Sequence, residues 1–482
     1  MSKSSVKKNF MYQMIYEVLV IILPFVTSPY IARVIGASGL GVYSYSYSIA
    51  FYFVLFSMLG LKNYGNRAIA MVRDNEKHLN ETFTNITILH IIVSLICLAA
   101  YVGYIFILAE QRLYAVIQLF YVLSGLFDIS WFYFGIEKFK MTVFRNITIK
   151  ILNVVCIFVF VRDEGDLWKY CLIMSLGMLI SSLILWVPLR KYVKFVKPDK
   201  QKILMHLKPL LILFIPAVAV SLYKYMDKIM IGQLSSKAQL GFYDNAEKIN
   251  IIPLTVISSF GTVMMPKMSN LAAKANKKES EKYMSISMQF VMFLAFALSF
   301  GLASIGKVFA PIFWGKEFTL SGTLMMYLSI TIPFISFANV IRTQYLIPNE
   351  KDREYILSVV LGAIVNLTIN FLLIPEHGAV GATIGTIAAE VTVCLVQVYA
   401  VRKELPMLRY LRSFIVFLPI GAVMFAATYG IGVLLGKSFT TLFIQIFVGG
   451  CIYAVFSLIY FVATKNEFFL KTVNGVKKKF IH

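Results

Sequence analysis

The chain has 482 residues, of which 59% are hydrophobic and only 15% are charged, and its mean hydropathy is +0.76. This composition excludes a water-soluble globular protein and indicates a polytopic membrane protein. The formal net charge of +22 does not indicate a nucleic-acid partner, because lysine and arginine concentrate in alternate loops between apolar stretches.

About fourteen apolar stretches follow one another along the chain, each with roughly the twenty residues that a membrane-spanning helix needs. We therefore predict an all-α fold. In chain order, the first six helices are expected at residues 10–33, 40–61, 84–108, 113–134, 143–161 and 167–189. The next six are expected at 209–232, 240–266, 284–306, 319–346, 355–375 and 377–401, and the last two at 413–435 and 440–463.

The loop charges predict the orientation of the chain in the membrane. Lysine and arginine are frequent in the loops on one side of the predicted helices and scarce on the other. By the positive-inside rule, this places both termini in the cytoplasm. The basic segment 190–208 and the tail residues 477–479 then face anionic headgroups, so membrane lipids are an expected partner.

A short motif that occurs twice predicts the domain organisation. Leu40-Gly41-Val42-Tyr43 recurs as Leu240-Gly241-Phe242-Tyr243. Six predicted helices separate the copies, so both have the same orientation, as in a parallel repeat about an axis along the membrane normal. We expect a six-helix lobe at 1–189, a basic linker at 190–208, a second six-helix lobe at 209–401, and two further helices with a basic tail at 402–482.

Charged residues inside predicted helices mark the candidate site, because an ionisable group in hydrocarbon costs about 2.5–3.5 kcal/mol and therefore faces a partner or water. Two triplets with i, i+3, i+4 spacing lie on consecutive helices: Lys224, Asp227 and Lys228, and Asp244, Glu247 and Lys248. Each triplet shares one helix face. The triplets are either self-neutralising clusters that fix helix register or part of the wall of a hydrated central cavity.

The first lobe offers Tyr30, Arg33, Tyr43 and Tyr47 at a similar depth. Tyrosine combines a flat apolar face with a hydroxyl, which suits stacking and hydrogen bonding against sugar rings. An aromatic belt at the outer interface is the alternative. Arg342, toward the inner end of its helix, could bind a phosphate with two hydrogen bonds or extend to the inner headgroups.

Four further ionisable residues are candidates for ion coupling. Asp128 and Lys150 lie level on adjacent predicted helices, so we expect an ion pair that is either structural or part of the mechanism. Glu17 and Glu390 have no evident local partner, and an isolated carboxylate in a low dielectric favours its protonated form. The five cysteines form no CxxC pair and the five histidines no metal-ligand spacing, so we expect no cofactor and no metal.

The opening of the chain resembles the Wzx-type polysaccharide flippases over residues 24–36, over the run Gly39-Leu40-Gly41-Val42-Tyr43-Ser44 and over residues 59–73. Residues 225–232 and 240–243 resemble the same family, and the likeness covers essentially the whole chain. The superfamily also includes multidrug and toxic compound extruders and lipid II flippases. The resemblance implies an alternating-access carrier in the bacterial inner membrane, coupled to a proton or sodium gradient.

The implied substrate is an undecaprenyl-diphosphate-linked oligosaccharide, which moves to the outer leaflet for capsule, exopolysaccharide or O-antigen synthesis. Polysaccharide polymerase and chain-length proteins are implied partners. The mixed charges of helices 209–232 and 240–266 depart from the cationic cavity of many family members. A cation-coupled multidrug exporter of the same fold is the alternative. We do not expect an enzyme, because the predicted outer loops are too short for an extracytoplasmic catalytic site.

Overall fold

The computed structural model describes residues 3–464, with the backbone alone for residues 3–22, 216, 219, 223 and 224. Every regular element in this described part is a helix. Ten helices there are long and apolar enough to cross a membrane, and two bent pairs of shorter helices raise the number to twelve. The prediction of an all-α, multi-pass membrane fold is confirmed.

Two of the helices each contain two predicted spans. α1 (Lys3–Met58) has 56 residues and α13 (Asp352–Val401) has 50. A straight α1 would be about 84 Å long at 1.5 Å per residue, far more than the hydrocarbon thickness of about 30 Å. The backbone leaves helical geometry at Gly36 (φ 73°) and Gly378 (φ 54°), where glycine avoids the steric penalty. With these breaks, the described helices account for the fourteen predicted spans.

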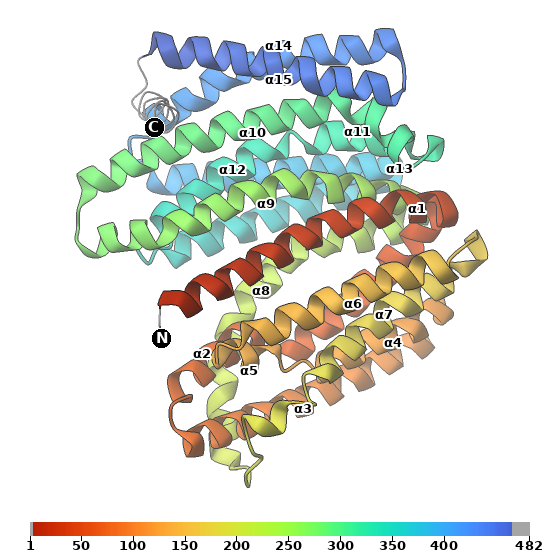
Figure 1. Ribbon diagram of the computed structural model, residues 1–482, viewed down its shortest axis with the longest axis vertical. Helices are drawn as coiled ribbons and strands as arrows, with labels where there is room; N and C mark the ends of the chain where they lie inside the picture. The colour runs from red at the N-terminus through yellow and green to blue at the C-terminus, as the bar shows by residue number, and fades with distance from the viewer. Residues whose placement is uncertain (1–2, 465–482) are drawn as a thin grey trace. The chain divides into compact units, whose positions relative to one another are not determined.

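Residue contacts divide the chain into two units, Met1–Gly241 and Phe242–His482. α8 packs against α1, α2 and α3 within the first unit, whereas the proposed lobe scheme assigns residues 209–232 to the second lobe. That lobe boundary stays a proposal. After α1, the first unit contains α2 (Leu61–Val72), α3 (Glu76–Ile107), α4 (Arg112–Leu126), α5 (Ser130–Gly135), α6 (Phe139–Phe160), α7 (Leu167–Ile184) and α8 (Lys200–Leu234), as Figure 1 shows.

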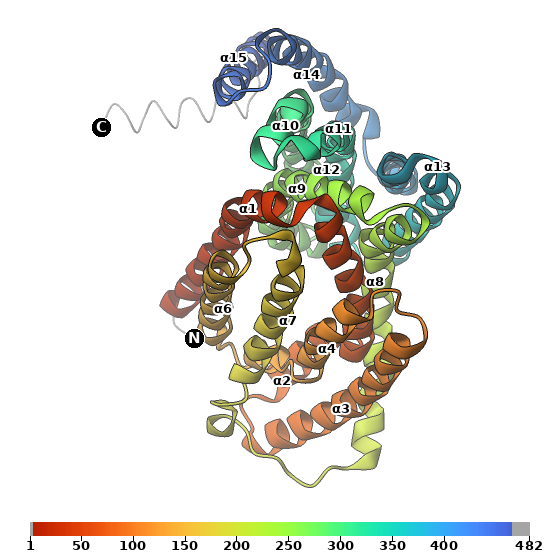
Figure 2. The ribbon, with the colours of Figure 1, turned by 90° about the vertical axis from the view of Figure 1, so that its right-hand side faces the viewer.

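Four helices of the first unit surround a common interior. α4 and α6 each pack against both α1 and α7, so they stand on opposite sides of that interior (Figure 2). The parts of α1 before and after Gly36, here called its two arms, contact different helices of this group. Before Gly36, the Tyr30 hydroxyl donates to the Val161 carbonyl just after α6, at 2.7 Å; beyond Gly36, Tyr47 stacks on Tyr121 of α4.

An extended segment before α8 is fixed to α3 by side chains that accept hydrogen bonds from its backbone. Three polar side chains of α3 accept hydrogen bonds from backbone N–H groups of this segment. The bonds run from Lys194 N to Asn80 Oδ1 (2.8 Å), from Val196 N to Thr84 Oγ1 (3.2 Å) and from Asp199 N to Asn85 Oδ1 (3.0 Å). The predicted linker is therefore held along part of its length.

The second unit is organised around α10, which packs against α11, α12, α14 and α15. Its apolar core includes Met288, Phe296, Phe337 and Phe417, each at most 2% exposed. Most of α9 (Lys237–Ala273) belongs to this unit. The remaining helices are α10 (Lys277–Phe313), α11 (Thr319–Leu328), α12 (Thr331–Ile341), a π-helical turn at Arg342–Leu346, α13, α14 (Met407–Leu435) and α15 (Phe439–Ala463).

The glycines of the repeated Leu-Gly-x-Tyr motif allow two helices to approach closely within the first unit. A Cβ at Gly41 would overlap the carbonyl group of Lys237, and a Cβ at Gly241 would overlap that of Ala37. Each glycine thus contacts the residue four positions before the other glycine. The start of α9 and the second arm of α1 cross backbone to backbone in a reciprocal way, which only glycine permits.

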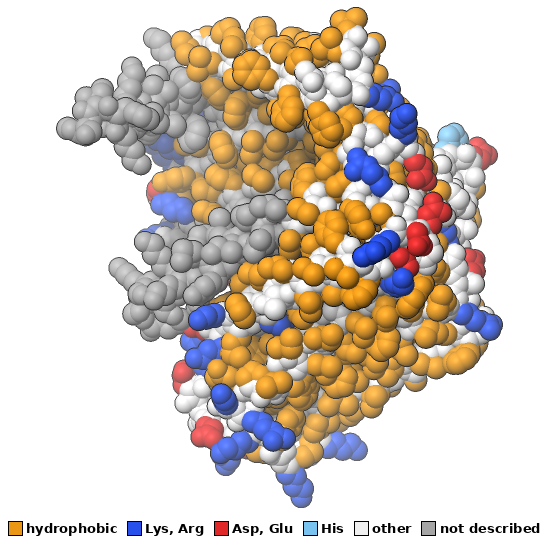
Figure 3. Space-filling view, turned by 45° about the vertical axis from the view of Figure 1, so that its right-hand side comes forward, with side chains coloured by type: hydrophobic (Ala, Val, Ile, Leu, Met, Phe, Trp, Pro, Cys, Tyr) orange, Lys and Arg blue, Asp and Glu red, His pale blue; other side chains and the backbone are white. Residues whose placement is uncertain are grey.

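Hydrophobic side chains cover broad areas of the surface visible in Figure 3, and charged side chains gather at its lower end and in a band toward its right side. Phe144 and Val155 of α6 are 69% and 52% exposed, and Phe443 of α15 is 70% exposed. Exposure of large apolar side chains on this scale suits contact with acyl chains rather than with water.

Candidate functional site

The first unit contains a polar cavity of about 670 Å³, within the range of about 300–1,000 Å³ that is typical of small-ligand sites. Helices α1, α2, α4, α5, α6 and α7 line it, together with the turn between α4 and α5. All of the lining residues belong to the first unit. Its polar members include Tyr43, Tyr47, Lys62, Gln118, Tyr121, Asp128, Arg145, Asn146, Lys150 and Asn153.

The α4 side of the cavity carries aromatic and amide groups. Gln118 and Tyr121 share a helix face at i, i+3. The Tyr121 ring lies 4.9 Å from the Tyr47 ring, and Tyr47 lies 5.9 Å from Tyr43, in stacked geometry. Gln118 is 1% exposed, and among the described groups neither of its amide atoms has a hydrogen-bond partner. A buried polar group left in this state costs about 1–3 kcal/mol, so a hydrogen bond to the amide would be stabilising.

The α6 side carries cationic and amide groups. Asn146, Lys150 and Asn153 follow one another at i, i+4 and i+7 and line the cavity from one helix face. Arg145 is held in place, because it donates to the Ser181 carbonyl of α7 at 3.0 Å and to Asn146 Oδ1. Lys150 is half-buried and makes no hydrogen bond or ion pair with the side chains that the structure describes. Its ammonium group is available to an anion.

The expected ion pair between Asp128 and Lys150 is not formed. α4 ends at Leu126, and Asp128 Oδ1 accepts a hydrogen bond from the Ser130 backbone N–H at 2.8 Å, at the start of α5. The predicted helix 113–134 corresponds to one candidate span, Arg112–Gly135, but the helix is interrupted between Leu126 and Ser130, where Asp128 lies. Lys62, Arg145 and Lys150 face the cavity with Asp128 as its one lining carboxylate, which gives the described lining a net positive charge.

Comparison with known proteins identifies the family. A model of the family described as "Polysaccharide biosynthesis protein" matches residues 6–272, more than half of the chain. The chain belongs to this family. A putative O-antigen transporter of Shigella dysenteriae is 24% identical over 400 residues, which cover 82% of this chain and 100% of that protein.

Solved structures support the fold of this polysaccharide biosynthesis protein. The lipid II flippase MurJ in an inward closed conformation superimposes with a TM-score of 0.74 at 15% identity, over 95% of this chain and 100% of that one. An outward-facing multidrug resistance MATE family transporter gives a TM-score of 0.50 at 13% identity, over 82% and 92% of the two chains. At these identities the likeness establishes the shared fold, and the predicted MATE-like architecture is confirmed.

Of the residues predicted for the site, Tyr43, Tyr47, Asp128 and Lys150 line the cavity of the first unit. Gln118, Arg145, Asn146 and Asn153 were not predicted. The helical spacing of the two asparagines about Lys150 is a signal that could have found them. His90 of α3 was also not predicted as a site residue. It is 4% exposed, and it interacts electrostatically with Asp128.

Four other predicted residues of the first unit have described side chains that do not line the cavity: Tyr30, Arg33, Asp227 and Lys228. Arg33 is exposed and Tyr30 is bound to the end of α6. Asp227 is 1% exposed, and the Lys228 ammonium lies 5.8 Å from the ring centroid of Tyr225, its neighbour on α8. The side chains of Glu17 and Lys224 lie outside the described residues. A substrate role for these residues stays a prediction.

In the second unit, Tyr243 is 1% exposed and its hydroxyl bonds to Thr386 Oγ1 at 3.0 Å. Asp244 pairs with Lys248 at 2.6 Å, one helical turn away. Glu247 of α9 and Glu390 of α13 each interact with another group. Arg342 is the first residue of the π-helical turn, and its guanidinium lies 5.7 Å from the ring centroid of Tyr355 in α13. Direct roles for these residues stay predictions.

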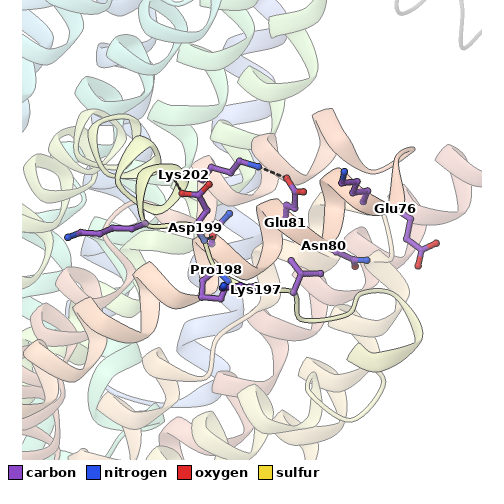
Figure 4. Close-up of a pocket in the computed structure, with 11 residues that line it drawn as sticks. Glu76, Asn80, Glu81, Lys197, Pro198, Asp199 and Lys202 are labelled. Carbon is purple, nitrogen blue, oxygen red and sulfur yellow. Dashed lines mark hydrogen bonds and ion pairs between the residues drawn. The ribbon is translucent and has the colours of Figure 1, made fainter.

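A second pocket, of about 1000 Å³, lies beside the segment that α3 holds (Figure 4). Its lysines and carboxylates partly neutralise one another: Lys202 pairs with Glu81 at 2.7 Å, and Asp199 caps the start of α8. Asn80 and Asn85 are occupied by backbone groups of the segment. The hydrogen bonds of this pocket explain how the segment is anchored, and its polar groups have less capacity left for a ligand than those of the α4–α6 cavity.

Proposed function

We propose that the protein moves lipid-linked oligosaccharides from the cytoplasmic to the outer leaflet of the bacterial inner membrane, for O-antigen, capsule or exopolysaccharide synthesis. Membership of the polysaccharide biosynthesis family and similarity to a putative O-antigen transporter support this proposal. The protein acts as a carrier and not as an enzyme. Both termini lie in the cytoplasm, as the distribution of lysine and arginine between the loops favours.

The observation that carries the proposal is the polar cavity among membrane-spanning helices. A diphosphate and its sugars lose their hydration if they enter hydrocarbon, and unpaired polar groups are costly there. A cavity with three cations, tyrosines and amides replaces part of that hydration. The polyprenyl chain has no such requirement and remains among the acyl chains.

Ion coupling supplies the direction of transport in this proposal. A membrane potential is worth about 2.3 kcal/mol per charge per 100 mV, which favours outward movement of an anion from a negative-inside cell. Return of the empty carrier is coupled to a proton or sodium gradient, with Asp128, Lys150, Glu17 and Glu390 as candidate residues. Polymerase and chain-length proteins then use the translocated units.

The test is translocation in proteoliposomes. The full chain is reconstituted with an undecaprenyl-diphosphate-linked oligosaccharide, and oxidation of its sugars by a membrane-impermeant reagent reports exposure. We expect exposure to exceed that of protein-free vesicles. Lys150→Gln should slow it by at least about tenfold, since one charge-assisted hydrogen bond is worth about 1.5–3 kcal/mol.

Lys437→Gln is the matched control. Lys437 is exposed between α14 and α15, and its substitution removes the same charge as Lys150→Gln. It should translocate at the wild-type rate. Exposure no faster than in protein-free vesicles would refute the proposal. If those same vesicles export a cationic dye in exchange for protons, the protein is instead a multidrug exporter.

A further inference from the structure

We infer that the cavity of the first unit is a two-walled sugar-phosphate site, in which the α4 wall binds a pyranose ring and the α6 wall binds the adjoining phosphate. This inference rests on the proposed function, and it assigns each wall to one part of the substrate. The two walls face each other because α4 and α6 each pack against both α1 and α7.

The α4 wall matches a sugar ring in its chemistry. Gln118 offers one acceptor and two donors, which pair with neighbouring hydroxyls of a pyranose. Its burial at 1% exposure and its unpaired amide atoms leave this capacity unused by the described groups. Tyr121 lies one turn further along α4, and its hydroxyl lies 3.4 Å from that of Tyr47. The stacked Tyr47 and Tyr121 both line the cavity on the same side as the amide.

The α6 wall matches a phosphate. Lys150 carries a full positive charge and three donors, and within the described structure no carboxylate neutralises it. Arg145 is already oriented by Ser181 and Asn146, so its positive charge is held in a fixed place on this wall. Asn153 adds an amide to the same helix face. Charged donors of this kind form the stronger hydrogen bonds with phosphate oxygens.

Other ligand classes fit the cavity less well. A cationic drug would meet Lys62, Arg145 and Lys150 with Asp128 as the lining carboxylate, so repulsion would exceed attraction. A divalent cation would find too few oxygen ligands of negative charge on these walls. A neutral oligosaccharide would leave the ammonium of Lys150 without an anion. An anionic saccharide satisfies both walls at once.

The experiment measures binding by the purified full chain in detergent, from the ligand dependence of its thermal unfolding. The probes are glucose 1-phosphate, glucose and inorganic phosphate. We expect glucose 1-phosphate to bind at least tenfold more tightly than either fragment. Lys150→Gln should weaken the binding of glucose 1-phosphate and of inorganic phosphate by a similar factor, of about ten.

Gln118→Met should weaken the binding of glucose 1-phosphate about tenfold and leave the affinity for inorganic phosphate unchanged. The matched control is Gln344→Met, because Gln344 in the second unit is also 1% exposed with both amide atoms unpaired among the described groups. It should leave all three affinities unchanged. If Gln118→Met does not fold, Tyr121→Phe removes one hydroxyl and should have the same selective effect.

Equal effects of Gln118→Met on glucose 1-phosphate and phosphate, or an effect of Gln344→Met as large, would overturn the two-walled site. So would glucose 1-phosphate binding no more tightly than phosphate. These outcomes leave translocation in proteoliposomes untouched, so failure of the site and failure of the proposed function are separately visible. A protein that binds glucose 1-phosphate as expected but translocates no lipid-linked oligosaccharide would refute the function and keep the site.

Discussion

The reciprocal crossing of the two Leu-Gly-x-Tyr motifs predicts that alanine is not tolerated at either glycine. A Cβ at Gly41 would lie 2.5 Å from the carbonyl carbon of Lys237, and a Cβ at Gly241 would lie 2.8 Å from that of Ala37. Non-bonded carbons are at their optimum near 3.5–4.0 Å, so either substitution forces the two helices apart by about 1 Å.

Overpacking of this kind typically costs about 1–3 kcal/mol. We expect Gly41→Ala to reach the upper end of that range, because a backbone carbonyl cannot rotate away as a side chain does. Gly241→Ala should cost a similar amount. Once one alanine has separated the helices, the second meets less resistance, so the double substitution should cost less than the sum of the two.

The assay is thermal unfolding of the purified variants, followed by the amount that remains monodisperse after heating. Gly103→Ala is the control, because Gly103 lies in α3 with open space around its Cα. It should be neutral or stabilise the protein by up to about 1 kcal/mol, since alanine is the better helix former. Gly41→Ala with wild-type stability, or strict additivity of the two glycine substitutions, would refute the close crossing.

Three further predictions concern stability. Asn80→Ala removes the acceptor of the Lys194 backbone N–H; we expect a loss of about 1–3 kcal/mol and faster proteolysis between residues 193 and 199, and an unchanged cleavage rate would contradict the anchoring. Hydrogen bonds from Lys351, then from Tyr345, lower the pKa of Glu404 in the loop after α13. Because the folded-state pKa is lowered, the ionised carboxylate stabilises the protein above the unfolded pKa near 4.5, and this stabilisation is lost as the pH falls further. Glu404→Gln should therefore remove that part of the pH dependence of the unfolding free energy, measured from pH 7 to pH 3. Gln118→Met should leave the ligand-free protein as stable as wild type or more so, because it removes an unpaired buried amide; a loss of several degrees in melting temperature would show that the amide is structurally bonded.

The spans could be predicted because hydropathy acts locally. Each segment of about twenty apolar residues is stable in a bilayer as a helix whatever its neighbours are. The turns between the first two and between the eleventh and twelfth predicted helices were expected, and the structure locates them at Gly36 and Gly378. The break after Leu126 was not expected, since the residues from Phe127 to Trp131 remain apolar apart from Asp128 and Ser130.

The candidate site was predicted only in part. Charge inside an apolar stretch is visible in a sequence, so Asp128 and Lys150 were found. Gln118 and Asn153 carry no charge, and an uncharged amide in a helix looks the same whether it is bonded or free. Their importance follows from where α4 and α6 pack relative to α1 and α7. The Asp128–Lys150 pair was predicted for an unbroken helix, whereas Asp128 lies in the turn after α4 and its carboxylate accepts a hydrogen bond from the Ser130 backbone N–H.

The amino-acid sequence by itself determined that this protein crosses the membrane many times, that it contains a repeated motif, and that it resembles the polysaccharide flippases. These features depend on composition and on short runs of residues. Only the tertiary structure decided that Gly41 and Gly241 each meet the backbone just before the other motif copy, and that Gln118, unpaired among the described groups, lines the same cavity as Lys150. Such relations join residues far apart in the chain, and their energy depends on distances that helix packing sets.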